Sequence, residues 1–297
     1  MATKILQIPV IYNLKQTSTF SLSISFSTPQ YHHPKSTSIP PKCTLPKPPA
    51  TKEEAILQAK TSLLSALEKN PKKLKKIKQP RFRVEIPVTD DSPNSLSELA
   101  LQVFDEMPMR RKGQKTKFLL LWGNKDLTQA AVKAFGCVSW VQNVDITSSI
   151  PVDDDILSAD VAVFMAPEAS RLAVMKTVGD CLYPKPLVIL NSGWSFEEEI
   201  DLGGFAGSFH VIYSFMGLVV RGIFSSRKGA IFKCARDTWH VFVEEDGELR
   251  AVSSFKSRPS MPEVENVLYN LMAVNSPVTK SARFLRDLVS NVIGRNK

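Results

Sequence analysis

The residues best suited to chemistry in this sequence come directly after three apolar runs in the middle of the chain. They carry amide, carboxylate, hydroxyl and indole groups, which can hold a small polar ligand through hydrogen bonds. These candidate ligand-binding residues are Asn124, Asp126, Glu168, Ser170, Asn191 and Trp194. Structural roles are the alternative, because such residue types also begin helices and fill loops.

A second candidate is a basic segment, Lys69–Arg83, which holds eight basic residues and no acidic residue. Lysine at this density neutralises phosphates or meets an anionic lipid surface or an acidic protein. The residues that would contact such a surface are Lys72, Lys73, Lys75, Lys76, Lys78 and Arg81. Only Phe82 is available for base stacking, so nucleic acid is a less suitable partner. A solvated linker is the alternative.

Signatures of other chemistries are missing from the sequence. It contains no phosphate loop of the form G-x-x-x-x-G-K-[ST], no strand-to-helix G-x-G-x-x-G and no G-x-S-x-G. His210 and His240 are isolated within strand-like segments, and the acidic runs Asp153–Asp155 and Glu197–Glu199 are typical of solvated turns or helix starts. We therefore expect no cofactor, no metal and no catalytic residue, although Asp153–Asp155 would be the first place to look for a bound cation.

The three apolar runs are Phe118–Trp122, Val161–Met165 and Leu187–Leu190, and helical segments follow the first two. Strands that are apolar on both faces and alternate with helices indicate a parallel sheet covered on both sides. Ligands of such sheets bind beyond the carboxyl ends of the strands, where the candidate ligand-binding residues would lie. A strand at 81–88 and a short one at 138–144 complete this part, with helices predicted at 51–69, 95–107, 126–135 and 168–178.

After Gly207 the pattern becomes strand-only. Segments 211–219, 230–234, 239–243 and 249–253 predict an antiparallel meander, with Asp246–Gly247 as a hairpin turn. Helices are predicted at 261–273 and 279–293. The fold class expected is α/β, with a mostly parallel, Rossmann-like sheet flanked by helices and extended by a C-terminal antiparallel β meander and terminal helices.

The first 52 residues contain no aspartate or glutamate, many hydroxyl residues, six lysines and no arginine. This composition is typical of a transit peptide, and the lack of arginine favours the chloroplast over the mitochondrion. A disordered tail and a secretory signal are the alternatives, but Gln7 and Pro9 interrupt the apolar core of a secretory signal. We predict a disordered, cleaved chloroplast transit peptide at residues 1–52 and a single α/β domain at residues 53–297.

Removing this leader reduces the net charge from +9 to +3, because it holds six of the 38 basic residues and none of the 29 acidic ones. The high pI therefore does not indicate a basic domain. No stretch approaches the ~20 apolar residues needed to cross a bilayer, so we expect no integral membrane segment. Cys137, Cys181 and Cys234 are isolated, and we expect them to be core thiols.

Five short segments resemble a plant and cyanobacterial domain family of unknown function, in the same order, across nearly all of residues 53–275. They are Arg83–Pro87, Leu187–Trp194, Ser208–Phe215, Asp237–Phe242 and Arg258–Ser260. Ser192 departs from the proline that often stands there in the family. The family occurs in the chloroplast Low-PSII-Accumulation type of assembly factor and as an appendage of a plastid adenylate kinase. The resemblance implies a plastid location and a role in photosystem assembly or maintenance, but no reaction.

We therefore expect a chloroplast accessory protein, in the stroma or at the thylakoid surface, that acts by binding rather than by catalysis. Its expected partners are thylakoid or photosystem proteins, or an anionic membrane surface. One alternative is a small-ligand-binding protein or enzyme with a pocket at the carboxyl ends of the parallel strands. Another is RNA binding through Lys69–Arg83.

Overall fold

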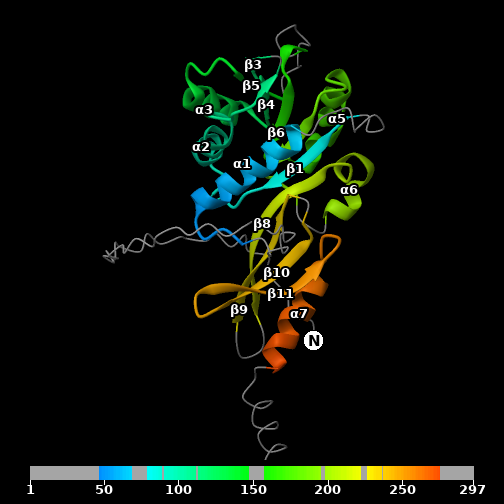
Figure 1. Cartoon of the computed structure of the whole chain (residues 1–297). Coiled ribbons are helices and arrows are strands. Elements are labelled where there is room, and N and C mark those ends of the chain that lie inside the picture. Colours follow the sequence, from blue (N-terminus) through cyan, green and yellow to red (C-terminus); the bar gives the residue numbers. More distant parts are fainter. Residues whose placement is uncertain are drawn as a thin grey trace, which may run out of the picture.

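The computed structural model describes residues 47–68, 79–88, 90–111, 113–146, 157–194, 198–221, 226–235 and 237–274 (Figure 1). The helices are α1 (Lys52–Glu68), α2 (Pro93–Phe104), α3 (Lys125–Phe135), the 3-10 turn η2 (Ala169–Arg171), α5 (Leu172–Cys181), α6 (Glu198–Ala206) and α7 (Met261–Val274). The strands are β1 (Arg81–Glu85), β2 (Arg110–Arg111), β3 (Gln114–Lys115), β4 (Phe118–Trp122), β5 (Val141–Asp145), β6 (Val161–Met165), β7 (Leu187–Leu190), β8 (His210–Arg221), β9 (Ser226–Cys234), β10 (Trp239–Glu245) and β11 (Glu248–Phe255).

Nine of these strands form one sheet in the order β11-β10-β9-β8-β1-β7-β6-β4-β5. From β8 to β5 the neighbouring strands are parallel, and from β8 to β11 they are antiparallel. The predicted fold class is confirmed. The three apolar runs are β4, β6 and β7, with the predicted bounds and with every residue buried.

Helices cover both faces of the parallel strands, which explains why these strands are apolar throughout. Successive residues of a strand point to opposite faces of the sheet. Leu120 and Val163 pack with α1, α2 and α3 on one face, whereas Leu121 and Phe164 pack with α5 and α6 on the other. Each apolar run therefore contributes to two cores.

Strand β8 joins the parallel strands to the meander, a role that the sequence analysis did not include. Its first part, from His210 to Ser214, pairs in parallel with β1. From Tyr213 to Arg221 it pairs with β9, so the meander lies beyond the carboxyl end of β1 (Figure 1, lower part). α7 packs there through Val264 and Leu268.

The predicted start of the second helix is wrong. The sequence predicts this helix at 95–107, but α2 begins at Pro93 and Ser92 is its N-cap, with Ser92 Oγ accepting a hydrogen bond from the Ser95 N–H at 3.3 Å. The physical reason is that proline suits the first helical position, because its φ is already helical and its missing N–H is not needed there. The helix also ends at Phe104 rather than near Met107.

Other local predictions hold. The Thr51 hydroxyl accepts a hydrogen bond from the Glu54 N–H at 3.1 Å at the start of α1, and the Glu263 carboxylate accepts one from the Ser260 N–H at 2.8 Å at the start of α7. The Asp246–Gly247 hairpin turn is confirmed, with φ angles of 54° and 81°. Lys69–Lys78, Asp153–Asp155, the predicted helix at 279–293 and all but the end of the predicted leader lie outside the described residues.

The expectation of core thiols is wrong for two cysteines. Cys137 and Cys181 are exposed, because they lie at the ends of helices α3 and α5, whereas Cys234 is half-buried. All three are free thiols. Within the described part of the chain, no helix is long and apolar enough to cross a membrane.

Candidate functional site

The predicted ligand residues after β4 and β6 contact the helices that follow these strands. Asn124 Oδ1 accepts a hydrogen bond from the Leu127 N–H at 2.9 Å, which makes Asn124 the N-cap of α3, and Asp126 is exposed in the first turn. Ser170 Oγ donates to Glu168 Oε2 at 3.1 Å. Within the described residues, no hydrogen bond links the residues after β4 to those after β6. Their contacts are therefore those of residues that begin helices.

Asn191 extends the pairing between β7 and β1. Its Oδ1 accepts a hydrogen bond from the Ile86 N–H at 2.7 Å, and its Nδ2 donates to the Ile86 carbonyl at 2.9 Å. The Asn191 backbone is left-handed, with φ at 52°, a conformation that asparagine tolerates better than most residues. The side-chain amide therefore replaces one residue of a parallel strand.

Replacing Asn191 with alanine should lower the free energy of unfolding by about 2–3 kcal/mol, because it removes both hydrogen bonds to Ile86. Urea unfolding measures the loss. Asn191→Gly is the control, since glycine adopts a φ of 52° without strain and isolates the contribution of the amide. A loss below about 1 kcal/mol in Asn191→Ala would contradict the pairing role.

Trp194 differs from the other predicted ligand residues because its polar atom is buried and lacks a partner within the described residues. The side chain is buried, and within the described residues its indole Nε1–H finds no hydrogen-bond acceptor. The Arg83 guanidinium lies over the indole ring, with Cζ 5.5 Å from the ring centroid. Trp194 therefore borders a group of buried charges.

Four charged residues, Arg83, Glu85, Glu199 and Arg258, form this group, which we call the charge cluster. Arg83 Nη2 lies 2.8 Å from Glu85 Oε1, and Arg258 Nη1 lies 3.2 Å from the same oxygen. Glu199 Oε1 is 2.7 Å from Arg83 Nη1, and Glu199 Oε2 is 2.8 Å from Arg258 Nη1. The Arg83–Glu199 contact is an ion pair without the alignment of a hydrogen bond.

The charge cluster joins the parallel strands to the meander. Arg83 and Glu85 belong to β1, Glu199 to α6, and Arg258 follows β11. Arg83 Nη2 also donates to Ser192 Oγ at 2.6 Å, and the Ser214 hydroxyl on β8 donates to Glu85 Oε2. Five elements therefore meet at these contacts.

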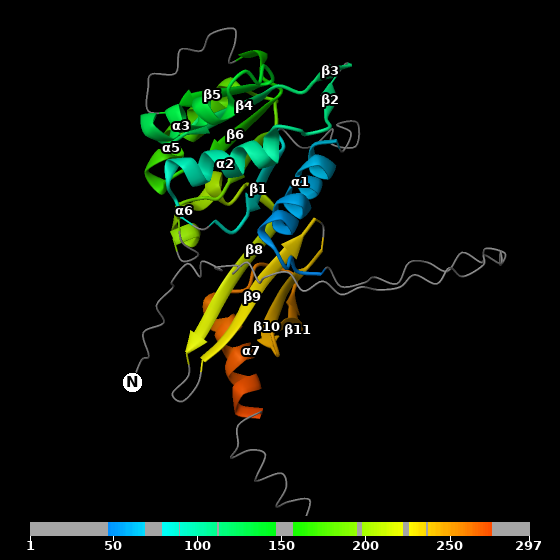
Figure 2. The same ribbon diagram turned by 90° about the vertical axis from the view of Figure 1, so that its left-hand side faces the viewer.

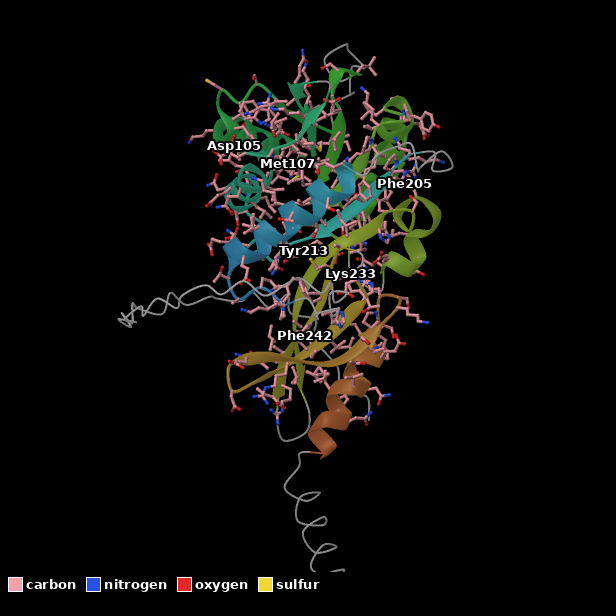
Figure 3. The ribbon with its side chains drawn as sticks, viewed as in Figure 1. Asp105, Met107, Phe205, Tyr213, Lys233 and Phe242 are labelled. Carbon is pink, nitrogen blue, oxygen red and sulfur yellow. The ribbon has the colours of Figure 1, made fainter. Side chains whose placement is uncertain are left out.

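The polar network continues into the meander through Trp239. The Trp239 ring lies 5.4 Å from Arg258 Cζ and 5.5 Å from Lys233 Nζ. Lys233 donates to the Asp237 carbonyl at 2.7 Å, and burial lowers its pKa although the Asp237 carboxylate acts in the opposite direction. Figure 3 shows Tyr213 and Lys233 in this region between the parallel strands and the meander.

The charged residues of the cluster stabilise one another in their ionised forms. Burial alone would raise the pKa of Glu85, but Arg258, Arg83 and the Ser214 hydroxyl together keep that pKa below its ordinary value of 4.5. Buried ions lose hydration, and that cost is offset only when each ion has well-placed partners. Glu85 is therefore a carboxylate at neutral pH.

The depressed pKa of Glu85 predicts a dependence of stability on acid. Its contribution is complete above pH 4.5, the ordinary value, and is lost as the pH falls below 4.5 towards the lower pKa of the folded state. Urea unfolding between pH 7 and pH 3 should show a steeper loss of stability below pH 4.5 in the wild type than in Glu85→Gln. Equal slopes in the two proteins would contradict this role.

No member of the charge cluster is among the site residues predicted from the sequence. Each of the five segments that carry the family resemblance nevertheless contributes to the cluster or to its extension: Arg83, Ser192, Ser214, Trp239 and Arg258 each come from a different segment. The sequence feature that could have indicated these residues is a side chain with a charged or polar group in each short segment.

The predicted anion-binding residues are described only in part. Arg81 is packed against α6 and the turn after it: its guanidinium lies 4.8 Å from the Phe205 ring centroid and donates to Ser208 Oγ at 2.8 Å. The predicted lysines, Lys72 to Lys78, lie outside the described residues. Their role stays a prediction.

A second basic segment was overlooked. Residues 110–117 include five basic residues and no acidic residue. Part of this segment forms the β2–β3 hairpin, in which Arg110 pairs with Lys115. Arg110, Lys115 and Lys117 are exposed. The sequence feature that could have indicated it is a second run of basic residues, shorter than Lys69–Arg83 but with a similar density of basic side chains.

One comparison with known proteins agrees with the resemblance to a family of unknown function. Residues 49–266 match the family described as a domain of unknown function, DUF1995. No curated protein matches the chain. One similar solved structure is the flagellar accessory protein FlaH from Methanocaldococcus jannaschii, with 9% sequence identity, 58% of this chain and 90% of that chain covered, and a TM-score of 0.27. The chain therefore belongs to the DUF1995 family of domains of unknown function.

Proposed function

We propose that this protein is a chloroplast accessory protein that binds the acidic surface of a thylakoid or photosystem protein during photosystem assembly or maintenance. The observation that carries the proposal is the basic β2–β3 hairpin. The composition of the leader supports the location, because acid-poor, hydroxyl-rich and arginine-free leaders are typical of chloroplast import.

The hairpin presents its positive charge at one end of the molecule. β3 leads into the amino end of β4, and Figure 2 shows the hairpin at the far end of the parallel strands from the meander. Arg110 Nη1 donates to the Gly113 carbonyl at 3.3 Å, and Lys115 Nζ lies 3.2 Å from the centroid of the Trp140 ring. In the described part of the chain, neither Arg110 nor Lys115 forms an ion pair. Their charges are available to a partner.

The chemistry of the hairpin favours a protein partner over RNA or a membrane. Residues 110–117 contain no aromatic side chain, so the hairpin itself offers no platform for base stacking. None of its described residues is an exposed large apolar side chain, which a surface helix or loop uses to enter the lipid interface. An acidic protein surface needs only the charges and steers association through them.

The other polar groups of the sheet support binding over catalysis in a strand-end pocket. The side-chain amides of Asn124 and Asn191 form hydrogen bonds with the backbone of this chain. The observation that favours the small-ligand alternative is the buried indole N–H of Trp194, which has no acceptor within the described residues.

The test begins with import of the full, epitope-tagged chain into isolated chloroplasts, followed by affinity capture. We expect a shortened, imported protein that co-purifies with thylakoid or photosystem proteins. Arg110→Glu/Lys115→Glu should reduce this capture at least about fivefold, because like charges then face the acidic partner. The control Lys125→Glu/Lys256→Glu makes the same charge change at exposed positions outside the hairpin and should capture as the wild type does.

Three outcomes would contradict the proposal. Failure of import would remove the chloroplast location, and equal capture by the hairpin variant would remove the hairpin as the binding surface. Capture of RNA whose amount falls steeply with salt, or binding to protein-free anionic vesicles alone, would replace the protein partner by the corresponding alternative.

A further inference from the structure

The two arginines of the charge cluster hold the Glu199 carboxylate between them. One carboxylate oxygen is 2.7 Å from Arg83 Nη1 and the other is 2.8 Å from Arg258 Nη1. Paired guanidinium groups on the two oxygens of one anion are a common arrangement for binding carboxylates and phosphates in proteins. The contact has the geometry of an occupied oxyanion site.

Two further donors at this place have no acceptor. Arg83 Nε and Trp194 Nε1 are buried, and within the described residues neither has a hydrogen-bond partner. The two side chains are in contact, with the Arg83 guanidinium 5.5 Å from the Trp194 ring centroid. Buried donors are normally satisfied, so these two unpaired donors at a cationic centre could bond more acceptor oxygens than Glu199 supplies.

Glu199 is the member of the cluster that is best able to leave. Its side chain is 22% exposed, against 14% for Glu85 and 3% for Arg83. Glu85 is fixed within β1 and is also bonded to Ser214, whereas Glu199 belongs to the nine-residue helix α6, which is interrupted at Gly203. Movement of α6 would separate Glu199 from both arginines while Glu85 stayed in place.

We propose that Arg83, Arg258 and Trp194 form a binding site for a small oxyanion, a carboxylate or a phosphate, and that Glu199 occupies the place of the anionic group when no ligand is bound. Ligand and Glu199 compete for the same two guanidinium groups. This site is separate from the basic hairpin, so it goes beyond the proposed function.

Removing the charge of Glu199 should reveal the site. In Glu199→Gln the cluster keeps two arginines and one carboxylate, and its net positive charge attracts an anion. Thermal unfolding of the full chain in increasing sodium phosphate, at constant ionic strength with sodium chloride, gives the phosphate affinity from the rise in Tm. We expect at least tenfold tighter phosphate binding in Glu199→Gln than in the wild type. Sodium succinate in a parallel titration distinguishes a carboxylate from a phosphate preference.

Matched variants separate the site from general charge effects. Glu198→Gln removes the same charge one residue earlier on α6, at an exposed position, and should bind phosphate as the wild type does. Adding Trp194→Phe to Glu199→Gln removes the indole N–H and should weaken binding at least threefold with no change in charge.

The proposal is overturned if Glu199→Gln binds neither anion more tightly than the wild type, or if Glu198→Gln gains as much. Should Glu199→Gln fail to fold, Glu199→Asp keeps the charge but shortens the reach to both arginines, and it should bind phosphate more tightly than the wild type. No gain in Glu199→Asp would then overturn the proposal. Capture of partners through the hairpin should be the same in all these variants, so the two proposals can fail independently.

Discussion

Replacing Arg83 with glutamine should lower the free energy of unfolding by about 3–5 kcal/mol, because it removes one partner of a buried ion pair and leaves carboxylates behind. The Arg83 side chain is 3% exposed and contacts Glu85, Glu199 and Ser192. Its loss should loosen the junction between β1, α6 and the segment after β7. Urea unfolding, followed by circular dichroism, measures the change.

The control is an ion pair in an exposed setting. Arg250 lies 3.4 Å from Glu245, and its side chain is 58% exposed, so Arg250→Gln should change stability by less than about 1 kcal/mol. The double variant Arg83→Met/Glu199→Leu removes one positive and one negative charge. Glu85 then remains paired with Arg258. The double variant should recover a large part of the loss, because apolar replacements of a buried pair are often neutral. A small loss in Arg83→Gln would show that the cluster does not hold the junction.

Replacing Trp239 with alanine should cost about 3–5 kcal/mol, the range for removing a buried tryptophan from a core. Trp239 is 4% exposed and packs in the core that the meander forms with α7. The substitution also removes the ring that both Arg258 and Lys233 contact. Amide hydrogen exchange should increase most in β10 and α7.

Trp239→Phe tests how much of this loss comes from the size of the side chain. Phenylalanine keeps an aromatic face for both cations and fills most of the volume, so the loss should be below about half of that for alanine. If alanine costs less than about 1 kcal/mol, or if exchange increases in β4 and β6 instead, Trp239 does not hold the meander.

The parallel strands could be predicted because their signal is local. β4, β6 and β7 are apolar on both faces, and a parallel sheet buried between helices requires that pattern. The start of α2 was predicted two residues too late because two serines, Ser92 and Ser95, both resemble a cap. Pro93 decides between them, because proline suits the first helical position.

The roles of the site residues could not be predicted, because they depend on distant contacts. Asn191 is a predicted ligand residue, and the sequence did not indicate that its amide also bonds Ile86, 105 residues away. Arg258 and Glu85 are 173 residues apart, and neither lies in a motif with known chemistry. Charges in such positions look like ordinary surface residues until the fold brings β1, α6 and the segment after β11 together.

The most direct test of the proposed function is site-specific photo-crosslinking in chloroplasts. A photoreactive residue replaces Gln114, which is exposed in the hairpin, and a second protein carries it at Val132, which is exposed on α3. We expect the Gln114 position alone to form an adduct with a thylakoid or photosystem protein, and we expect Arg110→Glu to suppress that adduct. No adduct at Gln114, or the same adducts from Val132, would contradict binding through the hairpin.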